Sequence, residues 1–345
     1  MNSKLTRRAV ISGLAFMAAS NASAQEQFGT PLIIRPEIEG VDPRYAAYAS
    51  SGPYVHPASP FTIRGSVGDI VIFHPRGANK ARLVVFSHGA LADPLTYRDL
   101  IWHWVTHGFV VAAPLHSDAV IENGPTLRVT EAGQVSKWPV SALLEDPAAW
   151  QERVDACRSC LDELEAIRSA TGIELELDRP VISGHGYGAY VAQLLLGTRV
   201  NVGEGQKLAF RDPRFFAGIV MSPQGPGIMG LDQRSWEEMS APTLFLVAEN
   251  DVDFTGQPSD EKSKSYLLSK PGYKHIGFLK SGSSNTFAGQ LARTNRNEAK
   301  LFEVTKAMTA CFLKAYGDYD TKAFEDLTTN FFERMSLQAV DEGRR

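Results

Sequence analysis

The chain has 345 residues, of which 43% are hydrophobic and 21% are charged, and its formal net charge is -4. These values are typical of a globular protein and exclude a fibrous or disordered chain. The 39 acidic residues outnumber the 35 basic ones, and no Lys/Arg-rich run occurs. We therefore expect no nucleic-acid partner, because phosphate binding depends on clustered cations.

The first 24 residues have the features of an export signal. Basic residues near the start, including the adjacent pair Arg7 and Arg8, precede an apolar stretch at 9–19. The small residues that end at Ala24 form a cleavage site, and the apolar stretch is too short to span a bilayer. An arginine pair in this position is typical of the twin-arginine signal, which exports folded proteins. We expect cleavage after Ala24, a bacterial periplasmic or secreted location, and a mature protein that does not span the membrane.

The rest of the chain divides into an arm, one domain and a tail. Residues 25–60 are rich in Pro, Ala, Ser and Tyr without periodicity, which predicts an irregular N-terminal arm. Residues 61–320 alternate strand and helix patterns, interrupted by a Gly/Pro-punctuated insertion at 119–148. The tail at 321–345 is predicted to be helical with a charged end.

Apolar runs predict eight strands, the first two as an antiparallel hairpin at one edge. The predicted strands are 61–66, 69–74, 82–87, 109–113, 179–183, 216–221, 243–247 and 275–279. The predicted helices are 97–106, 147–169, 189–196 and 297–316. This alternation predicts an α/β fold with a mostly parallel sheet and helices on both of its faces.

Two of the three cysteines form a C-x-x-C motif, Cys157 and Cys160. They lie inside a helical pattern with apolar residues at core spacing, whereas a redox motif begins a helix that follows a strand. We predict that both are core residues, and a disulfide after export stays open.

The sequence VISGHGYGA, from Val181 to Ala189, contains the most informative pattern. A buried strand leads through a glycine-spaced turn into a helix, as in the G-x-S-x-G turn that presents a serine nucleophile at a strained positive φ. The outer residues Gly184 and Gly188 suit the close packing of that turn, but its central residue is Gly186 instead of serine.

From about residue 60 to 320 the chain resembles α/β hydrolases of the bacterial dienelactone hydrolase and platelet-activating-factor acetylhydrolase-like group. The matching segments are VVFSHGALADPLTYRDL (84–100), THGFVVAAPLHSD (106–118), LDRPVISGHGYGAYVAQLL (177–195), DPRFFAGIVMSPQGPG (212–227) and PTLFLVAEND (242–251). The resemblance implies the α/β-hydrolase fold and a site of the carboxylic-ester hydrolase type.

Carried over position by position, the resemblance implies that Asp251, after the seventh strand, is the acid of a catalytic triad. It implies that the backbone N–H groups of Ala90 and Tyr187 form the oxyanion hole. The family's catalytic histidine falls at Ser284, in the stretch SGSSNTF, and the nucleophile falls at Gly186. Both the nucleophile and the base are therefore substituted. The resemblance adds a set of residues that shape the pocket: His88, Gly89, His185 and Ser222.

Natural loss of the triad competes with two simpler origins of these substitutions. A Ser→Gly substitution made in the laboratory would leave the histidine in place, and a misaligned last loop conflicts with the good fit of Phe287 and Gly289 to the family spacing. The nearby His275 opens the preceding strand, where we expect it to be too far from the turn.

Metal, cofactor and substitute-nucleophile chemistries are weakly supported. His88, His116 and His185, with Asp118 or Asp251, lack the short ligand spacing of a metal site, so we expect no metal. No dinucleotide or phosphate-binding fingerprint occurs, and we expect no cofactor. The residues that offer a substitute hydroxyl are Ser183, Ser222 and Ser284, and a serine without a base is a weak nucleophile.

Loss of the triad serine or histidine costs on the order of 10⁴ to 10⁶ in rate in subtilisin. The favoured hypothesis is therefore an exported pseudo-hydrolase that binds a small ester-, lactone- or lipid-like ligand, or a partner, in the inherited pocket. The alternatives are an active carboxylic-ester hydrolase or a lyase with relocated chemistry, and a purely structural role. The oligomeric state stays open.

Overall fold

The computed structural model describes residues 43–119, 143–203, 205–329, 331–332 and 339–345. The expected export signal, the first half of the expected arm (25–42) and most of the 119–148 insertion lie outside the described residues. The predictions made for those segments are therefore not addressed by the structure.

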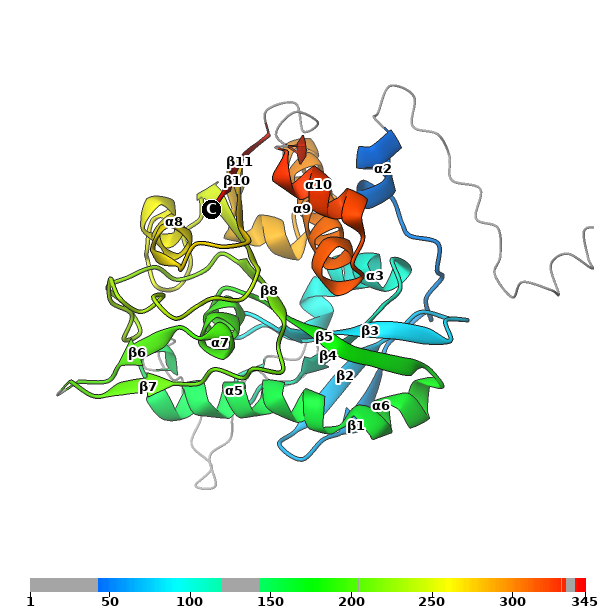
Figure 1. Ribbon diagram of the computed structural model, residues 1–345, viewed down its shortest axis with the longest axis horizontal. Coiled ribbons are helices and arrows are strands. Elements are labelled where there is room, and N and C mark those ends of the chain that lie inside the picture. Colours follow the sequence, from blue (N-terminus) through cyan, green and yellow to red (C-terminus); the bar gives the residue numbers. More distant parts are fainter. Residues whose placement is uncertain (1–42, 120–142, 204, 330, 333–338) are drawn as a thin grey trace, which may run out of the picture. The chain divides into compact units, whose positions relative to one another are not determined.

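Within the described residues, the chain forms a nine-stranded sheet in the order β1-β2-β4-β3-β5-β8-β9-β10-β11 (Figure 1). The strands are β1 (Phe61–Arg64), β2 (Asp69–Phe73), β3 (Lys80–Ser87), β4 (Phe109–Pro114), β5 (Glu174–His185), β8 (Ala217–Met221), β9 (Thr243–Asn250), β10 (Lys274–Ser283) and β11 (Val340–Arg344). Strands β4, β3, β5, β8, β9 and β10 are parallel, and β1, β2 and β11 add antiparallel edges. A separate ribbon pairs β6 (Arg199–Asn201) with β7 (Lys207–Ala209).

All eight predicted strands are present, but β11 is an addition within the segment that we predicted to be helical. The helix α10 (Thr321–Thr328) agrees with that prediction, whereas β11 pairs antiparallel with β10, with Leu279 opposite Val340. The prediction failed because β11 has the sequence VDEGR, in which only Val340 is fully buried. Charged edge strands of this kind carry little hydrophobic periodicity.

The expected irregular arm is also partly ordered, because it contains the helix α2 (Pro43–Ala49). Two of its tyrosines, Tyr45 and Tyr48, are buried in the core. The sequence did not predict this helix because PRYAAYA is too short to repeat the apolar spacing of a helix.

Helices cover both faces of the sheet, which confirms the predicted α/β architecture (Figure 1). One face carries α2, α3 (Arg98–Thr106), α9 (Arg296–Phe312) and α10, and the other carries α5 (Pro147–Asp162), α6 (Leu164–Thr171), α7 (Tyr187–Leu196) and α8 (Ser259–Leu268). The alternation of strand side chains divides the core: Val84 and Phe86 pack on the first face, and Leu83 and Val85 on the second.

The predicted helix 147–169 is two helices, α5 and α6, that meet at Glu163. On α5, Cys157 and Cys160 are fully buried and free, which confirms that they are core residues. The third cysteine, Cys311, is also buried and free.

The parallel strands bring the expected site residues to one edge of the sheet. Strands β3, β5, β8, β9 and β10 each end immediately before a residue that the sequence singled out. The carboxyl ends of parallel strands are the usual location of sites in open α/β sheets. The following loops carry, in strand order, His88, Gly186, Ser222, Asp251 and Ser284.

Candidate functional site

The turn between β5 and α7 has the backbone geometry of a nucleophile turn. Gly186 has φ 54° and ψ -117°, and its N–H donates to the carbonyl of Met221 at 2.9 Å. A Cβ built on Gly186 meets no heavy atom within 4 Å. The turn therefore has room for a nucleophilic side chain and presents none.

The outer glycines of the turn are required by close packing, as the sequence predicted. A Cβ on Gly184 would lie 2.2 Å from the carbonyl oxygen of Gly188, and a Cβ on Gly188 would lie 1.9 Å from that of Ser87. These contacts place the start of α7 directly against the end of β3.

The loop after β3 carries the expected oxyanion residue Ala90 and is held by Arg153 from α5. The guanidinium donates to the carbonyls of His88, at 2.7 Å, and Gly89, at 3.3 Å. It also pairs with Asp118 at 2.7 Å, and both side chains are nearly inaccessible. Burial by itself would raise the pKa of Asp118, but Arg153 lowers it below its usual value, so the pair stays ionised.

This loop also lies against the nucleophile turn. A Cβ on Gly89 would lie 2.8 Å from Tyr97 Oη and 3.5 Å from His185 Nδ1. Because α7 begins at Tyr187, the N–H of this residue has no acceptor within the helix. The structure therefore brings the loop of Ala90 and the N–H of Tyr187 to the same end of the sheet.

His88 and His116 form a neutral structural pair beneath this loop. The Nε2 atom of His88 accepts the backbone N–H of His116 at 3.2 Å, so its proton is on Nδ1, which faces the carbonyl of Gly89 at 2.9 Å. Burial, followed by the nearby Arg153, lowers the pKa of His88 to about 3. Both histidines therefore remain uncharged near neutral pH.

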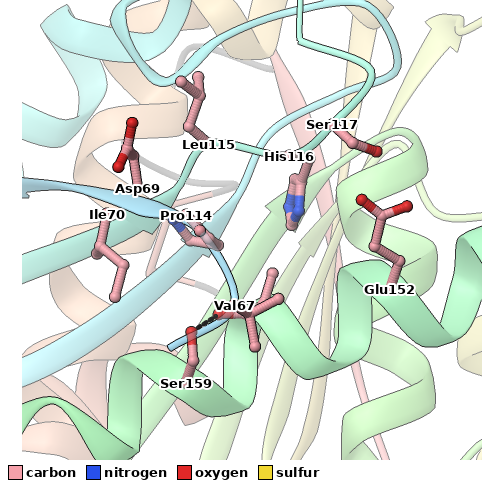
Figure 2. Close-up of a pocket in the computed structure, with 11 residues that line it drawn as sticks. Val67, Asp69, Ile70, Pro114, Leu115, His116, Ser117, Glu152 and Ser159 are labelled. Atoms are coloured by element: carbon pink, nitrogen blue, oxygen red, sulfur yellow. Dashed lines mark hydrogen bonds between the residues drawn. The ribbon is translucent and has the colours of Figure 1, made fainter. Parts of the chain in front are cut away.

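His116 also lines a small pocket, shown in Figure 2, between the turn that joins β1 to β2 and the helix α5. Its neighbours there include Val67 and Glu152. The lining contains no residue of β5 or α7, so this pocket is distinct from the space at Gly186.

The expected acid, Asp251, is fully buried after β9 and accepts two strong hydrogen bonds. Ser222 Oγ donates to its Oδ1 atom at 2.6 Å, and Lys262 Nζ donates to the same atom at 3.1 Å. Lys262 also donates to Ser222 Oγ and to Asp253 Oδ2, each at 2.8 Å. Burial raises the pKa of Asp251, and Lys262 opposes that rise.

Ser222 lies between Asp251 and Ser284. It has a φ of 53°, a left-handed conformation that is rare for serine, and is completely buried. Ser284 Oγ donates to Ser222 Oγ at 3.4 Å. The link from Asp251 to Ser284 therefore passes through the Ser222 hydroxyl.

Ser284 begins the short helix η2 (Ser284–Ala288) and is partly exposed. Its Oγ atom lies 3.1 Å from His185 Nε2, and the other ring nitrogen of His185 lies 2.7 Å from Tyr97 Oη. That hydroxyl also accepts the N–H of Gly89 at 3.2 Å. Burial, with a smaller contribution from Lys262, lowers the pKa of His185 to about 4.

The direction of the hydrogen bonds along this chain depends on the tautomer of His185. If Tyr97 accepts from Gly89 and donates its one hydroxyl proton to His185 Nδ1, the imidazole proton is on Nε2 and points to Ser284 Oγ. Ser284 then donates to Ser222, and Ser222 donates to Asp251. In this arrangement His185 donates a hydrogen bond to Ser284, whereas a general base would accept one from it.

The remaining hydroxyls and histidine do not form a standard triad either. Ser183 is fully buried in β5, and its Oγ has no hydrogen-bond partner within the described residues. His275 lies in the core, with its Nε2 atom 2.7 Å from Tyr316 Oη. This agrees with the expectation that it lies away from the turn. Within the described residues, no three His, Cys, Asp or Glu side chains gather as metal ligands.

Sequence reasoning missed Lys262, Asp253 and Tyr97, which complete the polar cluster. The sequence SDEKSKSYLL of α8 is mostly polar, so its helical spacing gave no signal. Tyr97 lies 88 residues before its partner His185, and no local pattern connects them. For Asp253, the position two residues after Asp251 is a signal that could have placed it in the cluster.

Comparison with known proteins supports the assignment of the fold. Residues 63–202 match the family model described as Chlorophyllase, an α/β-hydrolase-like family. The match includes the loop after β3, Arg153 and the turn at Gly186, and it ends before Ser222. No curated protein matches the chain. The sheet order, the nucleophile turn and this match define an α/β-hydrolase fold.

No helix in the described part of the chain is long and apolar enough to cross a membrane.

Proposed function

We propose that this protein is a catalytically impaired α/β-hydrolase-fold protein that binds a small ester-, lactone- or lipid-like ligand in the inherited site. The observation that carries the proposal is Gly186, which has the backbone conformation of a nucleophile and free space where the side chain would be. A ligand carbonyl can occupy this space and accept hydrogen bonds from the N–H groups of Ala90 and Tyr187, without becoming bonded to the protein.

The position of the base supports the same proposal. Ser284 replaces the histidine, and the hydrogen-bond chain through Ser222 satisfies the acid Asp251 without an imidazole. What remains is binding with oxyanion stabilisation, which gives roughly 10³- to 10⁴-fold acceleration over water. Efficient hydrolysis through an acyl-enzyme is therefore not expected.

One contact favours a second candidate function, an ester hydrolase with relocated residues. Ser284 is partly exposed and lies 3.1 Å from His185 Nε2, the distance expected of a nucleophile and its base. This function requires the opposite imidazole tautomer, in which Nδ1 donates to Tyr97 and Nε2 accepts the proton of Ser284.

Hydrolysis of p-nitrophenyl butyrate by the wild-type protein and by S284A distinguishes the two functions. The proposal expects wild-type turnover near the background rate and no effect of S284A. Turnover like that of an ordinary esterase, abolished by S284A, would establish the second candidate instead.

Binding is tested by the shift in melting temperature with the same ester, because a ligand of the native state stabilises it. We expect a positive shift in the wild type that G186L removes, since the leucine side chain fills the free space. G172L is the matched control: Gly172 also has a positive φ, 70°, and open space, but it ends α6 away from the site. A shift that survives G186L as well as G172L would contradict binding at Gly186.

We further propose that the protein acts outside the cytoplasm, on the basis of its export signal. The mature protein recovered from the periplasm or medium is expected to begin at Gln25, as measured by N-terminal sequencing or intact mass. An uncleaved chain retained in the cytoplasm would contradict this location.

A further inference from the structure

A buried lysine, Lys262, occupies the acid site and has no role in the function proposed above. Its side chain and that of Asp251 are completely inaccessible, and that of Asp253 is 12% exposed. Lys262 Nζ lies 3.1 Å from Asp251 Oδ1, 2.8 Å from Asp253 Oδ2 and 2.8 Å from Ser222 Oγ. A buried ammonium is retained only when such partners compensate for its lost hydration.

The position of this lysine is fixed by the packing of α8 against the loop after β8. A Cβ on Gly225 would lie 1.9 Å from the carbonyl oxygen of Glu261, the residue before Lys262. Gln257 joins the two segments, since it accepts the N–H of Gly225 at 2.7 Å and donates to the carbonyl of Pro226 at 3.0 Å. This packing fixes the backbone position from which the Lys262 side chain reaches the acid, and its three hydrogen bonds hold the ammonium there.

This contact changes what Asp251 can do. The acid of a triad accepts the Nδ1 proton of the catalytic imidazole and stabilises the imidazolium that forms. Here one oxygen of Asp251 already accepts from both the Ser222 hydroxyl and the Lys262 ammonium. The positive charge neutralises the carboxylate and would repel an imidazolium beside it.

We propose that Lys262 has replaced the catalytic imidazole as the partner of Asp251, so that restoring the nucleophile and the base does not by itself restore hydrolysis. Lys262 is thus a positioning residue, acting through the acid. This inference rests on the proposed function, in which the site is impaired.

The charges of Lys262, Asp251 and Asp253 indicate which substitutions would remove the lysine from Asp251 without changing the net charge. K262M alone would leave two buried carboxylates without a cation. The pair K262M/D253N removes one positive and one negative charge, so the net charge of the cluster is unchanged and Asp251 keeps its bond from Ser222. Asn also preserves the oxygen with which Asp253 accepts from Thr255.

The test compares hydrolysis of p-nitrophenyl butyrate by G186S/S284H and by G186S/S284H/K262M/D253N. We expect kcat/KM to be at least about tenfold higher in the second variant, because loss of the triad aspartate alone costs about 3 × 10⁴ in subtilisin. K264M in place of K262M/D253N is the control, since Lys264 lies on the same helix with 39% of its side chain exposed. Equal activity in the first two variants would overturn the inference.

The pH dependence separates this role from a general effect on stability. In G186S/S284H the Lys262 ammonium disfavours the imidazolium form of the introduced histidine and so lowers its pKa. We therefore expect the acid limb of kcat/KM to lie at lower pH in G186S/S284H than in G186S/S284H/K262M/D253N. A purely structural role of Lys262 would change the rate without moving the acid limb. Coinciding limbs would therefore contradict the inference.

A second measurement remains decisive if the fourfold variant does not fold. In S284H alone, NMR can measure the pKa of the imidazole introduced at position 284. We expect this pKa to lie below the value of about 6.5 for unperturbed histidine. A value above 6.5 would show that Asp251 is available to the imidazole and would overturn the inference. Wild-type esterase activity, by contrast, would contradict the proposed function, so the two failures are distinguishable.

Discussion

At the scale of single residues, two positions determine the chemistry that the site can perform. Gly186 adopts the backbone conformation of a nucleophile turn and offers no hydroxyl, and Ser284, where the family resemblance expects the catalytic histidine, offers no imidazole. Ser222 links Asp251 to Ser284, because it donates to Asp251 at 2.6 Å and accepts from Ser284. Within the described residues, the buried carboxylate is therefore hydrogen-bonded without an imidazole partner.

The substitution G186S is expected to lower the stability of the protein. A non-glycine residue in the left-handed conformation at φ 54° stores strain of about 1–3 kcal/mol, whereas free space at this position means that no clash is added. Urea unfolding should show a loss of this size in G186S and a similar loss in G186A, because the cause is the backbone. An unchanged or increased stability of G186S would show that a serine at this turn stores no strain.

At the scale of elements, α2 joins the N-terminal part of the described chain to the C-terminal helices. Tyr48 donates to Asp326 of α10 at 2.7 Å, and the carbonyl of Tyr48 lies 2.8 Å from Nε2 of His103 on α3. Both Tyr48 and Asp326 are buried, so their hydrogen bond is made without competition from water.

We expect Y48F to destabilise the protein by about 1–3 kcal/mol, because it leaves the buried carboxylate of Asp326 without its hydroxyl donor. Y45F is the control on the same helix, since the Tyr45 hydroxyl makes no hydrogen bond within the described residues. Urea unfolding of both variants measures the difference. Equal effects would show that the contribution of α2 comes from packing alone.

The elements also show how far the sequence predicts the structure. Strongly apolar segments such as β3 and β4 were predicted closely, because buried strands are nearly all hydrophobic. The helix α8 and the strand β11 were not, because their residues are polar and their location depends on packing against distant segments.

The site likewise contains residues that local motifs predict and residues that they do not. Gly186, Asp251 and Ser284 were placed from local motifs, and the structure brings them to one edge of the sheet. Lys262 and Tyr97 could not be found in this way, since their contacts with Asp251 and His185 join segments that are unrelated in sequence. Contacts set by tertiary packing have no local signature in the sequence.

At the scale of the whole molecule, buried neutral histidines make stability depend on pH. Burial lowers the pKa of five of them: His88, His103, His116, His185 and His275. For His185 and His275 the value is about 4, against about 6.5 in an unfolded chain. Between these values the unfolded chain binds more protons, so acidification favours unfolding.

We expect the free energy of unfolding to fall when the pH is lowered from 7 to 5. Each group with a pKa of about 4 contributes a loss of about 2 kcal/mol at pH 5, by linkage from an unfolded value of 6.5. Urea unfolding at the two pH values, at constant ionic strength, measures the change. A free energy of unfolding that is equal or larger at pH 5 would contradict the neutral state of these histidines.

The central claim is that no serine in the site is activated. The most direct measurement is the reaction of the full mature protein with a fluorophosphonate, which forms a stable adduct with activated serines, followed by intact-mass spectrometry. An ordinary serine esterase, treated in parallel, shows that the reagent is active. We predict that the mass of this protein stays unchanged, and an adduct that peptide mapping places on Ser284 or Ser222 would contradict the proposed function.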